Sequence, residues 1–171
     1  EQFYAWSTMF PADFQTAGTW NLFLQWHGCS SNPPVSFMLE EVGGVPTLHM
    51  TIKLIDRWDE PWAHDVTLDA WHDFVFHVMW STDPAVGFVE LWYDGDLVLP
   101  RYSVATLYDD WCTPYLKMGL YRFGSTAGLT TLYHDGLTIG TSLQDVLPGA
   151  ESCGGQSGTC CGACTSACGG E

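Results

Sequence analysis

Positively charged residues are scarce in this 171-residue chain. Five Lys and Arg stand against 20 Asp and Glu, which gives a formal net charge of −15 with His neutral. A nucleic-acid-binding protein needs a basic surface for the phosphate backbone, so no nucleic acid is expected as a partner. The same charge repels any other polyanion at long range. Because the Debye length is about 8 Å at physiological salt, charges that line a cleft matter far more than distant ones.

Long apolar runs are missing as well. No uninterrupted apolar stretch reaches the roughly 20 residues that a membrane span needs, and no signal peptide precedes Glu1. We therefore expect a soluble chain with no membrane partner. The first residue is not Met, which is consistent with a processed product or a fragment.

Cysteine is rare before the tail and crowded within it. Five of the seven cysteines are Cys153, Cys160, Cys161, Cys164 and Cys168. This usage favours an oxidising, extracellular compartment, and hence a secreted protein, and the odd count leaves at least one thiol unpaired. The tail has no His and no standard zinc spacing, so we favour a linker or a disulfide knot over a metal site.

The composition changes at Pro148. Up to residue 147 the chain alternates apolar segments with turn residues, and from there it consists mainly of Gly, Ser, Thr and Cys. Such a tail buries little surface. The sequence predicts one folded domain over residues 1–147 and a Gly/Ser/Cys-rich tail over 148–171.

The apolar segments are short and rich in aromatic and β-branched residues, which is typical of strands. We predict strands over residues 21–27, 35–41, 47–55, 72–81, 88–93, 115–123 and 130–138, with turns at Asp94-Gly95 and Asp135-Gly136. No convincing helix lies between them. The spacing predicts an all-β sandwich.

Successive side chains of a strand point to opposite faces, so the sequence also predicts faces. In 47–54 the even-numbered residues are apolar, and Thr47, His49, Thr51 and Lys53 form the opposite, solvated face. The other predicted core sets are Leu116, Met118 and Leu120, which oppose Tyr115, Lys117, Gly119 and Tyr121, and Leu22, Leu24 and Trp26, which oppose Phe23, Gln25 and His27. Segment 72–80 is apolar on both faces, which predicts a central strand.

Four polar residues would meet on one concave surface if 21–27 and 115–123 are neighbouring strands. They are Gln25, His27, Lys117 and Tyr121. Cleavage of a uronic-acid polymer by elimination needs a group that neutralises the carboxylate, a base for the proton next to it, and an acid for the leaving oxygen. The amide, imidazole, ammonium and phenol can fill these roles.

Two motifs carry a resemblance. Gln25-Trp26-His27 is similar to the Gln-x-His motif, and the segment from Tyr115 to Tyr121 is similar to the Tyr-x-Lys-x-Gly-x-Tyr motif, of jelly-roll polysaccharide lyases. This group includes alginate lyases of family seven, glucuronan lyases and heparin-lyase-like proteins. The likeness runs from Tyr4 to about Gly140. It implies a β-jelly roll, a concanavalin-like sandwich of two antiparallel sheets with a concave substrate cleft.

The resemblance also implies roles for the four residues. Gln25 and His27 would neutralise the carboxylate, His27 would be an alternative base, and Tyr121 would transfer protons with support from Lys117. Family members carry an Arg on a strand before the segment that begins at Tyr4, and we expect that this chain lacks that N-terminal strand. Arg122 after Tyr121 favours a glucuronan-like or heparin-like substrate over alginate.

Further residues are candidates for binding substrate: Tyr115, Arg122, His49, Lys53, Trp92 and Glu90. Tyr115 is explained equally by strand propensity, and a solvated face explains His49 and Lys53 as well as a site does. Trp92 with Glu90 would form a sugar-stacking platform, although Trp as ordinary core is the commoner case. The remaining histidines, His64, His72, His77 and His134, receive no role.

Cys29 and Cys112 fall at the same end of the two motif strands if these run antiparallel, which predicts a disulfide between them. No organic cofactor is expected. Calcium stays open, because acidic loop residues such as Asp56, Asp83 and Asp109 are suitable ligands.

Three functions are compatible with these residues. The first is a monomeric lyase acting on an acidic polysaccharide, and the second is a non-catalytic carbohydrate-binding module of the same fold. A structural or adhesive fragment that uses the Cys-rich tail is the third, and nothing in the strands argues for it.

Overall fold

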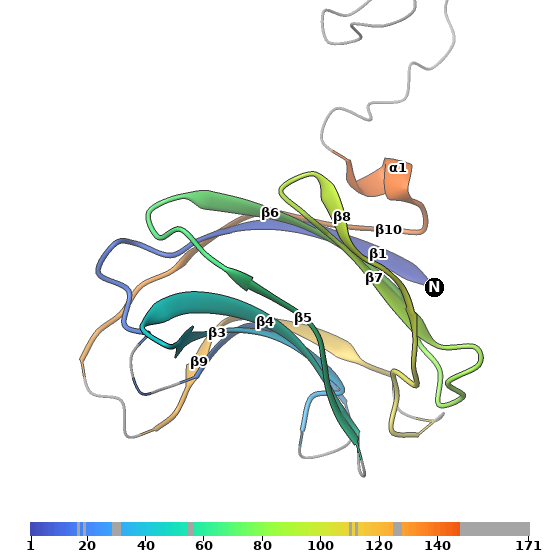
Figure 1. Cartoon of the computed structure of the whole chain (residues 1–171). Helices are drawn as coiled ribbons and strands as arrows, with labels where there is room; N and C mark the ends of the chain where they lie inside the picture. The colour runs from blue at the N-terminus through green and yellow to red at the C-terminus, as the bar shows by residue number, and fades with distance from the viewer. Residues whose placement is uncertain are drawn as a thin grey trace, which may run out of the picture.

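The protein is described by a computed structural model that covers residues 1–16, 18, 20–28, 32–54, 57–109, 111, 113–124 and 128–147. Its strands form two antiparallel five-stranded sheets, which lie one above the other as two curved layers (Figure 1). The first sheet has the order β10-β1-β6-β7-β8 and the second β5-β4-β3-β2-β9. The predicted all-β jelly-roll architecture is confirmed.

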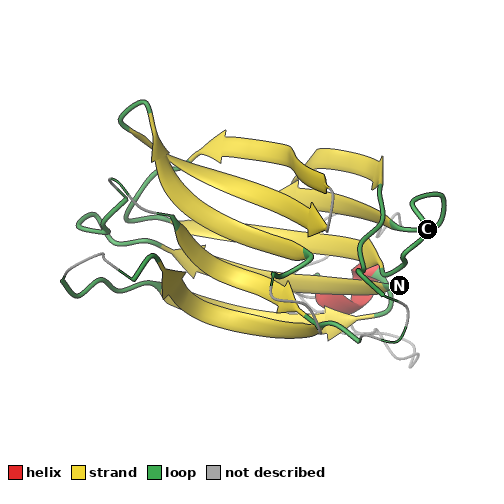
Figure 2. Cartoon of the chain, turned by 90° about the horizontal axis from the view of Figure 1, so that it is seen from below, coloured by secondary structure: helices red, strands yellow, loops and turns green. Residues whose placement is uncertain are grey.

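The bounds of the elements are as follows. The first sheet consists of β10 (Tyr133–Gly140), β1 (Gln2–Met9), β6 (Trp71–Met79), β7 (Phe88–Tyr93) and β8 (Asp96–Ser103). The second sheet consists of β5 (Arg57–Asp65), β4 (Val45–Leu54), β3 (Val35–Val42), β2 (Asn21–His27) and β9 (Tyr115–Arg122). One helical turn, α1 (Leu143–Val146), drawn red in Figure 2, follows β10 and packs on β1 and β10.

Aromatic side chains fill the space between the sheets. Trp26 of β2 is fully buried and contacts Tyr4 and Phe76 of the first sheet, with ring centroids 4.8 and 4.6 Å away. Trp6 stacks on Phe74 at 5.0 Å. Each of these rings removes a large apolar area from water, and edge-to-face and offset contacts add to that stabilisation. The aromatic side chains of the two sheets therefore form one shared core.

The second sheet curves so that its outer face, on the side away from the first sheet, is concave (Figure 1). The register between its strands shows one cause. While β3 advances two residues, from Ser36 to Met38, β2 needs three residues and β9 needs four to span the paired positions. Extra residues of this kind are β-bulges, which bend and twist a strand. The bulges therefore contribute to the concave face.

The same bulge overturns part of the predicted alternation in β2. Phe23 is 1% exposed and packs against Phe10 and Phe37, whereas Leu22 lies on the concave face. Simple alternation predicts the reverse. Phe23 and Leu24 both face the core because the register shifts between Leu22 and Leu24. Gln25, Trp26 and His27 keep their predicted sides.

Three strands were not predicted, and two of them lie at sheet edges. β5 contains Pro61 and β8 contains Pro100, and each is the last strand of its sheet. Proline has no N–H for a ladder, so it is tolerated at edges and weakens the strand signal there. β1 lies between β10 and β6. The nearly continuous apolar run over residues 3–6 of this strand lacks a clear period of two.

The two predicted turns have different outcomes. Asp94 and Gly95 both have positive φ and reverse the chain between β7 and β8, as predicted. Asp135 and Gly136 instead lie inside β10, at a register shift against β1. Gly136 adopts φ 65° there, so this Asp-Gly pair forms a bulge rather than a turn.

The helical turn α1 is fixed to the end of β10 by one carboxylate. Asp145 Oδ2 accepts hydrogen bonds from the backbone N–H of Thr141 at 2.9 Å and of Ser142 at 2.8 Å. These bonds hold the pKa of Asp145 below its usual range. Within the described residues no helix is long and apolar enough to cross a membrane.

Candidate functional site

A groove of about 730 Å³ occupies the concave face of the second sheet. All five strands of that sheet contribute side chains to it. The lining residues are Trp20, Leu22, Gln25, His27, Asn32, Pro33, Ser36, Met38, Glu40, Thr51, Lys53, Trp58, Glu60, Lys117 and Tyr121. The groove thus contains polar, charged and aromatic groups together, as carbohydrate sites require for hydrogen bonding and stacking.

The four predicted catalytic residues meet in this groove. β2 pairs with β9 antiparallel, with Gln25 opposite Lys117 and Leu22 opposite Tyr121. The expected neighbour relation of the two motif strands is therefore confirmed. A straight row crosses four strands, from Lys117 through Gln25 and Ser36 to Thr51. Each of these side chains lines the groove.

The imidazole of His27 is oriented by the next residue. Its Nδ1 lies 3.0 Å from the carbonyl oxygen of Gly28. A carbonyl only accepts, so Nδ1 carries the proton, and in the neutral ring the lone pair is on Nε2. The ring of Tyr115 lies 5.8 Å from that of His27. His27 is thus set to accept a proton through Nε2.

Aromatic rings flank both β9 residues of the site. Lys117 Nζ lies 5.2 Å from the ring centroid of Tyr115, within cation–π range. Tyr121 is 59% exposed, and its ring lies 5.2 Å from Trp20. Tyr115 therefore stands at the rim beside His27 and Lys117, and the phenol of Tyr121 is open to a ligand.

His49 lies beneath the groove rather than on a solvated face. It is 4% exposed, and Thr47 and Thr51 of the same predicted wet face are buried too. Its Nδ1 lies 2.9 Å from a carboxylate oxygen of Glu60, and its Nε2 lies 3.6 Å from Glu40. Neither contact has hydrogen-bond geometry. The two carboxylates cover His49 and line the groove themselves.

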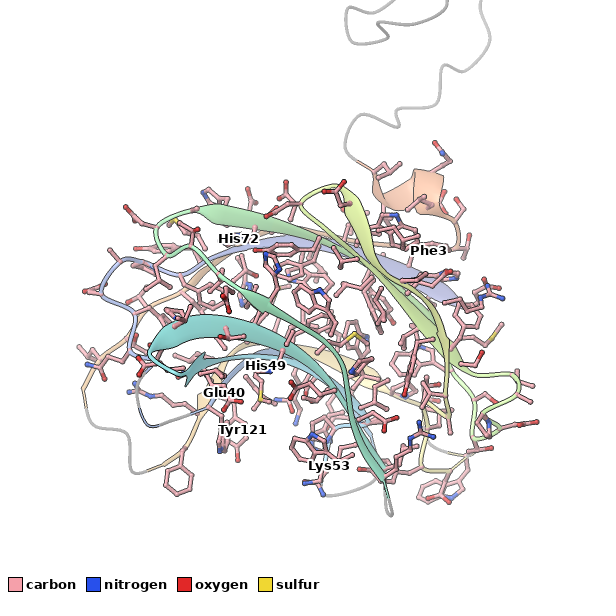
Figure 3. The ribbon with its side chains drawn as sticks, in the orientation of Figure 1. Phe3, Glu40, His49, Lys53, His72 and Tyr121 are labelled. Carbon is pink, nitrogen blue, oxygen red and sulfur yellow. The ribbon has the colours of Figure 1, made fainter. Side chains whose placement is uncertain are left out.

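Lys53 reaches the groove near its β5 edge. Lys53 pairs directly with Trp58, and its Nζ lies 4.7 Å from the indole centroid. Trp58 is 57% exposed. Figure 3 shows Lys53 and Tyr121 projecting from the same side of the second sheet, away from Phe3 and His72 of the first sheet.

Two predicted binding residues lie on the other sheet. Trp92 and Glu90 belong to β7 of the other sheet, and their neighbours Val89, Leu91 and Tyr93 face the core, so both point away from the groove. Glu90 contacts His77 there. The predicted platform is therefore not part of this groove, because β7 belongs to the other sheet.

Arg122 is also outside the groove. It follows Tyr121 on β9 and therefore faces the opposite side, where its Nη2 donates to the carbonyl oxygen of Gly128. A guanidinium bonded to its own following loop is not available to a ligand in the groove. The structure therefore does not place Arg122 with the other predicted site residues.

Sequence reasoning missed Trp20, Glu40, Trp58 and Glu60. The alternation of 35–41 would have indicated that Ser36, Met38 and Glu40 share a face, whereas β5 gave no strand signal from which to place Trp58 and Glu60. Cys29, Cys112, Asp56 and the tail cysteines lie outside the described residues. Among the described residues no group of three His, Cys, Asp or Glu is arranged to hold a metal.

Comparison with known proteins identifies the family. The family model described as polysaccharide lyase matches residues 1–138. The chain therefore belongs to the polysaccharide lyase family. No curated protein matches the sequence.

Solved structures share the fold. An alginate lyase from Pseudomonas aeruginosa is 12% identical with a TM-score of 0.55, and the match covers 81% of this chain and 64% of that one. The catalytic domain of a GH131 β-glucanase from Podospora anserina is 13% identical with a TM-score of 0.59, over 85% and 60% of the two chains. This chain thus spans less than two thirds of either structure.

Proposed function

We propose that this chain is a catalytic domain that cleaves a uronic-acid-containing polysaccharide, glucuronan-like or heparin-like, by β-elimination. The observation that supports it most is the convergence of Gln25, His27, Lys117 and Tyr121 on one groove. The proposal includes an extracellular location, action as a monomer, and chemistry without an organic cofactor.

The proposed reaction divides its tasks among the four side chains. The Gln25 amide and the Lys117 ammonium bind the substrate carboxylate, which stabilises the charge that develops when the neighbouring carbon loses its proton. Neutral His27 accepts that proton at Nε2, since its Nδ1 proton points to Gly28. A carbon–carbon double bond forms, the bond to the glycosidic oxygen breaks, and the Tyr121 hydroxyl gives this oxygen a proton.

A non-catalytic sugar-binding module is the second candidate, and one observation favours it. Glu40 and Glu60 line the same groove as Lys53 and Lys117, so the groove itself carries no surplus of positive charge. Such a balance suits binding of a weakly charged sugar. Elimination, by contrast, requires the carboxylate to be neutralised.

The test measures the ultraviolet absorbance of the unsaturated sugar that elimination leaves behind, with glucuronan, alginate, heparin and chondroitin as substrates. We expect a rise on glucuronan or heparin. Tyr121→Phe removes the hydroxyl and keeps the ring, so it should lower kcat by at least about a hundredfold, the usual contribution of a general acid.

Tyr133→Phe is the matched control, because Tyr133 is a half-exposed tyrosine on β10 of the other sheet. It should leave the rate unchanged. If no product forms on any of the four polymers while binding is still measurable, the chain is a sugar-binding module and the lyase proposal is wrong. An equal loss in both tyrosine variants would remove Tyr121 from the mechanism.

A further inference from the structure

The groove carries a second cationic position that the elimination mechanism does not use. Lys53 and Trp58 lie side by side near the β5 edge of the concave sheet, and both line the groove. Lys53 has no carboxylate partner among the ion pairs of the described residues. Its ammonium is held by an aromatic face, which leaves its hydrogen-bonding capacity for an incoming anion.

The register fixes how far this position is from Lys117. Lys117, Gln25, Ser36 and Thr51 form one row over β9, β2, β3 and β4, and Lys53 is two residues beyond Thr51. Three strand spacings and two residues along a strand give roughly 15 Å between the two lysines. This is several sugar units, so one sugar ring cannot contact both.

Two carboxylates on the floor of the groove restrict the path that a polyanionic sugar can take between the two lysines. Glu40 lies on β3 toward the end of the strands where Tyr121 stands, and Glu60 lies on β5 level with Thr51, with its carboxylate directed toward His49. His27 and Lys53 lie toward the other end. A polyanion is repelled by the two carboxylates and attracted by Lys53 and Lys117, since like charges in a cleft repel and opposite charges attract.

We propose that Lys53 and Trp58 form a distal uronate subsite. A sugar chain crosses the strands from β9 to β5, the carboxylate at the reacting unit contacts Gln25 and Lys117, and a carboxylate several units away binds Lys53 while its ring contacts the indole of Trp58. This rests on the proposed function only for the reacting unit. The subsite makes the groove selective for polymers over short oligosaccharides.

The experiment compares Lys53→Gln with the wild type on a uronic-acid polymer and on a trisaccharide cut from it. Loss of a charge-assisted contact should raise KM for the polymer about tenfold with kcat unchanged. KM for the trisaccharide, which is too short to reach Lys53, should stay the same. Trp58→Ala should give the same pattern.

Arg101→Gln is the matched control. Arg101 lies on β8 of the other sheet, where its side chain contacts Glu90 and the ring of Phe88, so the variant removes one positive charge from outside the groove. It should leave both KM values unchanged. An equal KM rise on polymer and trisaccharide for Lys53→Gln, or a polymer effect as large for Arg101→Gln, would overturn the subsite.

Binding measurements keep the two proposals separate. If no polymer is cleaved, affinity electrophoresis in gels that contain the polymer still reports the retardation of each variant. Loss of retardation in Lys53→Gln alone supports the subsite even without lyase activity. Equal retardation of wild type and Lys53→Gln removes the subsite whatever the catalytic result.

Discussion

The histidines of this molecule have quite different surroundings. His27 lies in the groove, His49 lies under two carboxylates, and His134 is half-buried near the start of β10, with its ring beside Phe23. His134 Nδ1 is 3.0 Å from the hydroxyl oxygen of Thr8. Burial lowers the pKa of His134, since the charged ring would lose its hydration.

This environment predicts a pH-dependent stability. The pKa of His134 is lower in the folded chain than the value of about 6.5 expected when unfolded. The unfolded state therefore binds the proton more readily, and the contribution of neutral His134 is complete above that value and is lost as the pH falls below it. We expect the melting temperature of the wild type to fall more steeply between neutral and mildly acidic pH than that of His134→Asn.

The measurement is thermal unfolding followed by circular dichroism over a pH series, with the difference between the two proteins as the readout. The carboxylates and the other histidines titrate in both proteins, so their contributions cancel in that difference. Parallel curves would show that His134 is equally easy to protonate in the folded and unfolded chains.

At the scale of the element, the bulge in β2 is where the structure departs most clearly from the simple alternation of faces. Phe23→Ala should destabilise the fold by about 3–5 kcal/mol, because the ring is buried among Phe10, Phe37 and Phe74 and its loss leaves a cavity. Leu22→Ala, on the groove side, should cost only about 1 kcal/mol. Urea unfolding gives both values, and the reverse order would restore simple alternation.

The strands show what the sequence could and could not predict. β2 and β7 have their predicted bounds because period-two patterns with clear turn residues depend only on local chemistry. Faces were wrong where a strand gains an extra residue relative to its neighbour, as at Phe23, since alternation within one strand carries no information on register. Trp92 shows the same limit, because its strand was predicted and its sheet was not.

The candidate site follows the same logic. Gln25, His27, Lys117 and Tyr121 were predictable since two adjacent motif strands carry them. Glu40, Glu60 and Trp58 depend on the full order β5-β4-β3-β2-β9, which no local pattern contains.

At the scale of the whole molecule, charge opposes the proposed substrate. The chain has a net charge of −15, while Lys53 and Lys117 attract an anion within the groove. Moderate salt screens distant charges before it weakens contacts at a few ångströms. We expect kcat/KM for a polyanionic polymer to rise from low salt to an ionic strength at which the Debye length is about 8–10 Å, and to fall at higher salt.

Initial rates over a sodium chloride series at constant pH test this profile. Added uncharged sucrose at matched osmolarity should leave kcat/KM unchanged. A decline that begins at the lowest salt would mean that the groove cations outweigh the rest of the molecule at every distance.

The position of β9 in its sheet has a consequence for the way the site holds together. Among the described strands β9 pairs only with β2, whereas β2 pairs on both sides. Local opening of β9 breaks one ladder and needs less free energy than global unfolding, so its amides should exchange with solvent sooner than those of β2. A ligand that contacts Gln25 and Lys117 together binds only the closed form, and its binding free energy is added to the local stability of β9. Ligand affinity and the persistence of the β2–β9 ladder are therefore thermodynamically coupled in this groove.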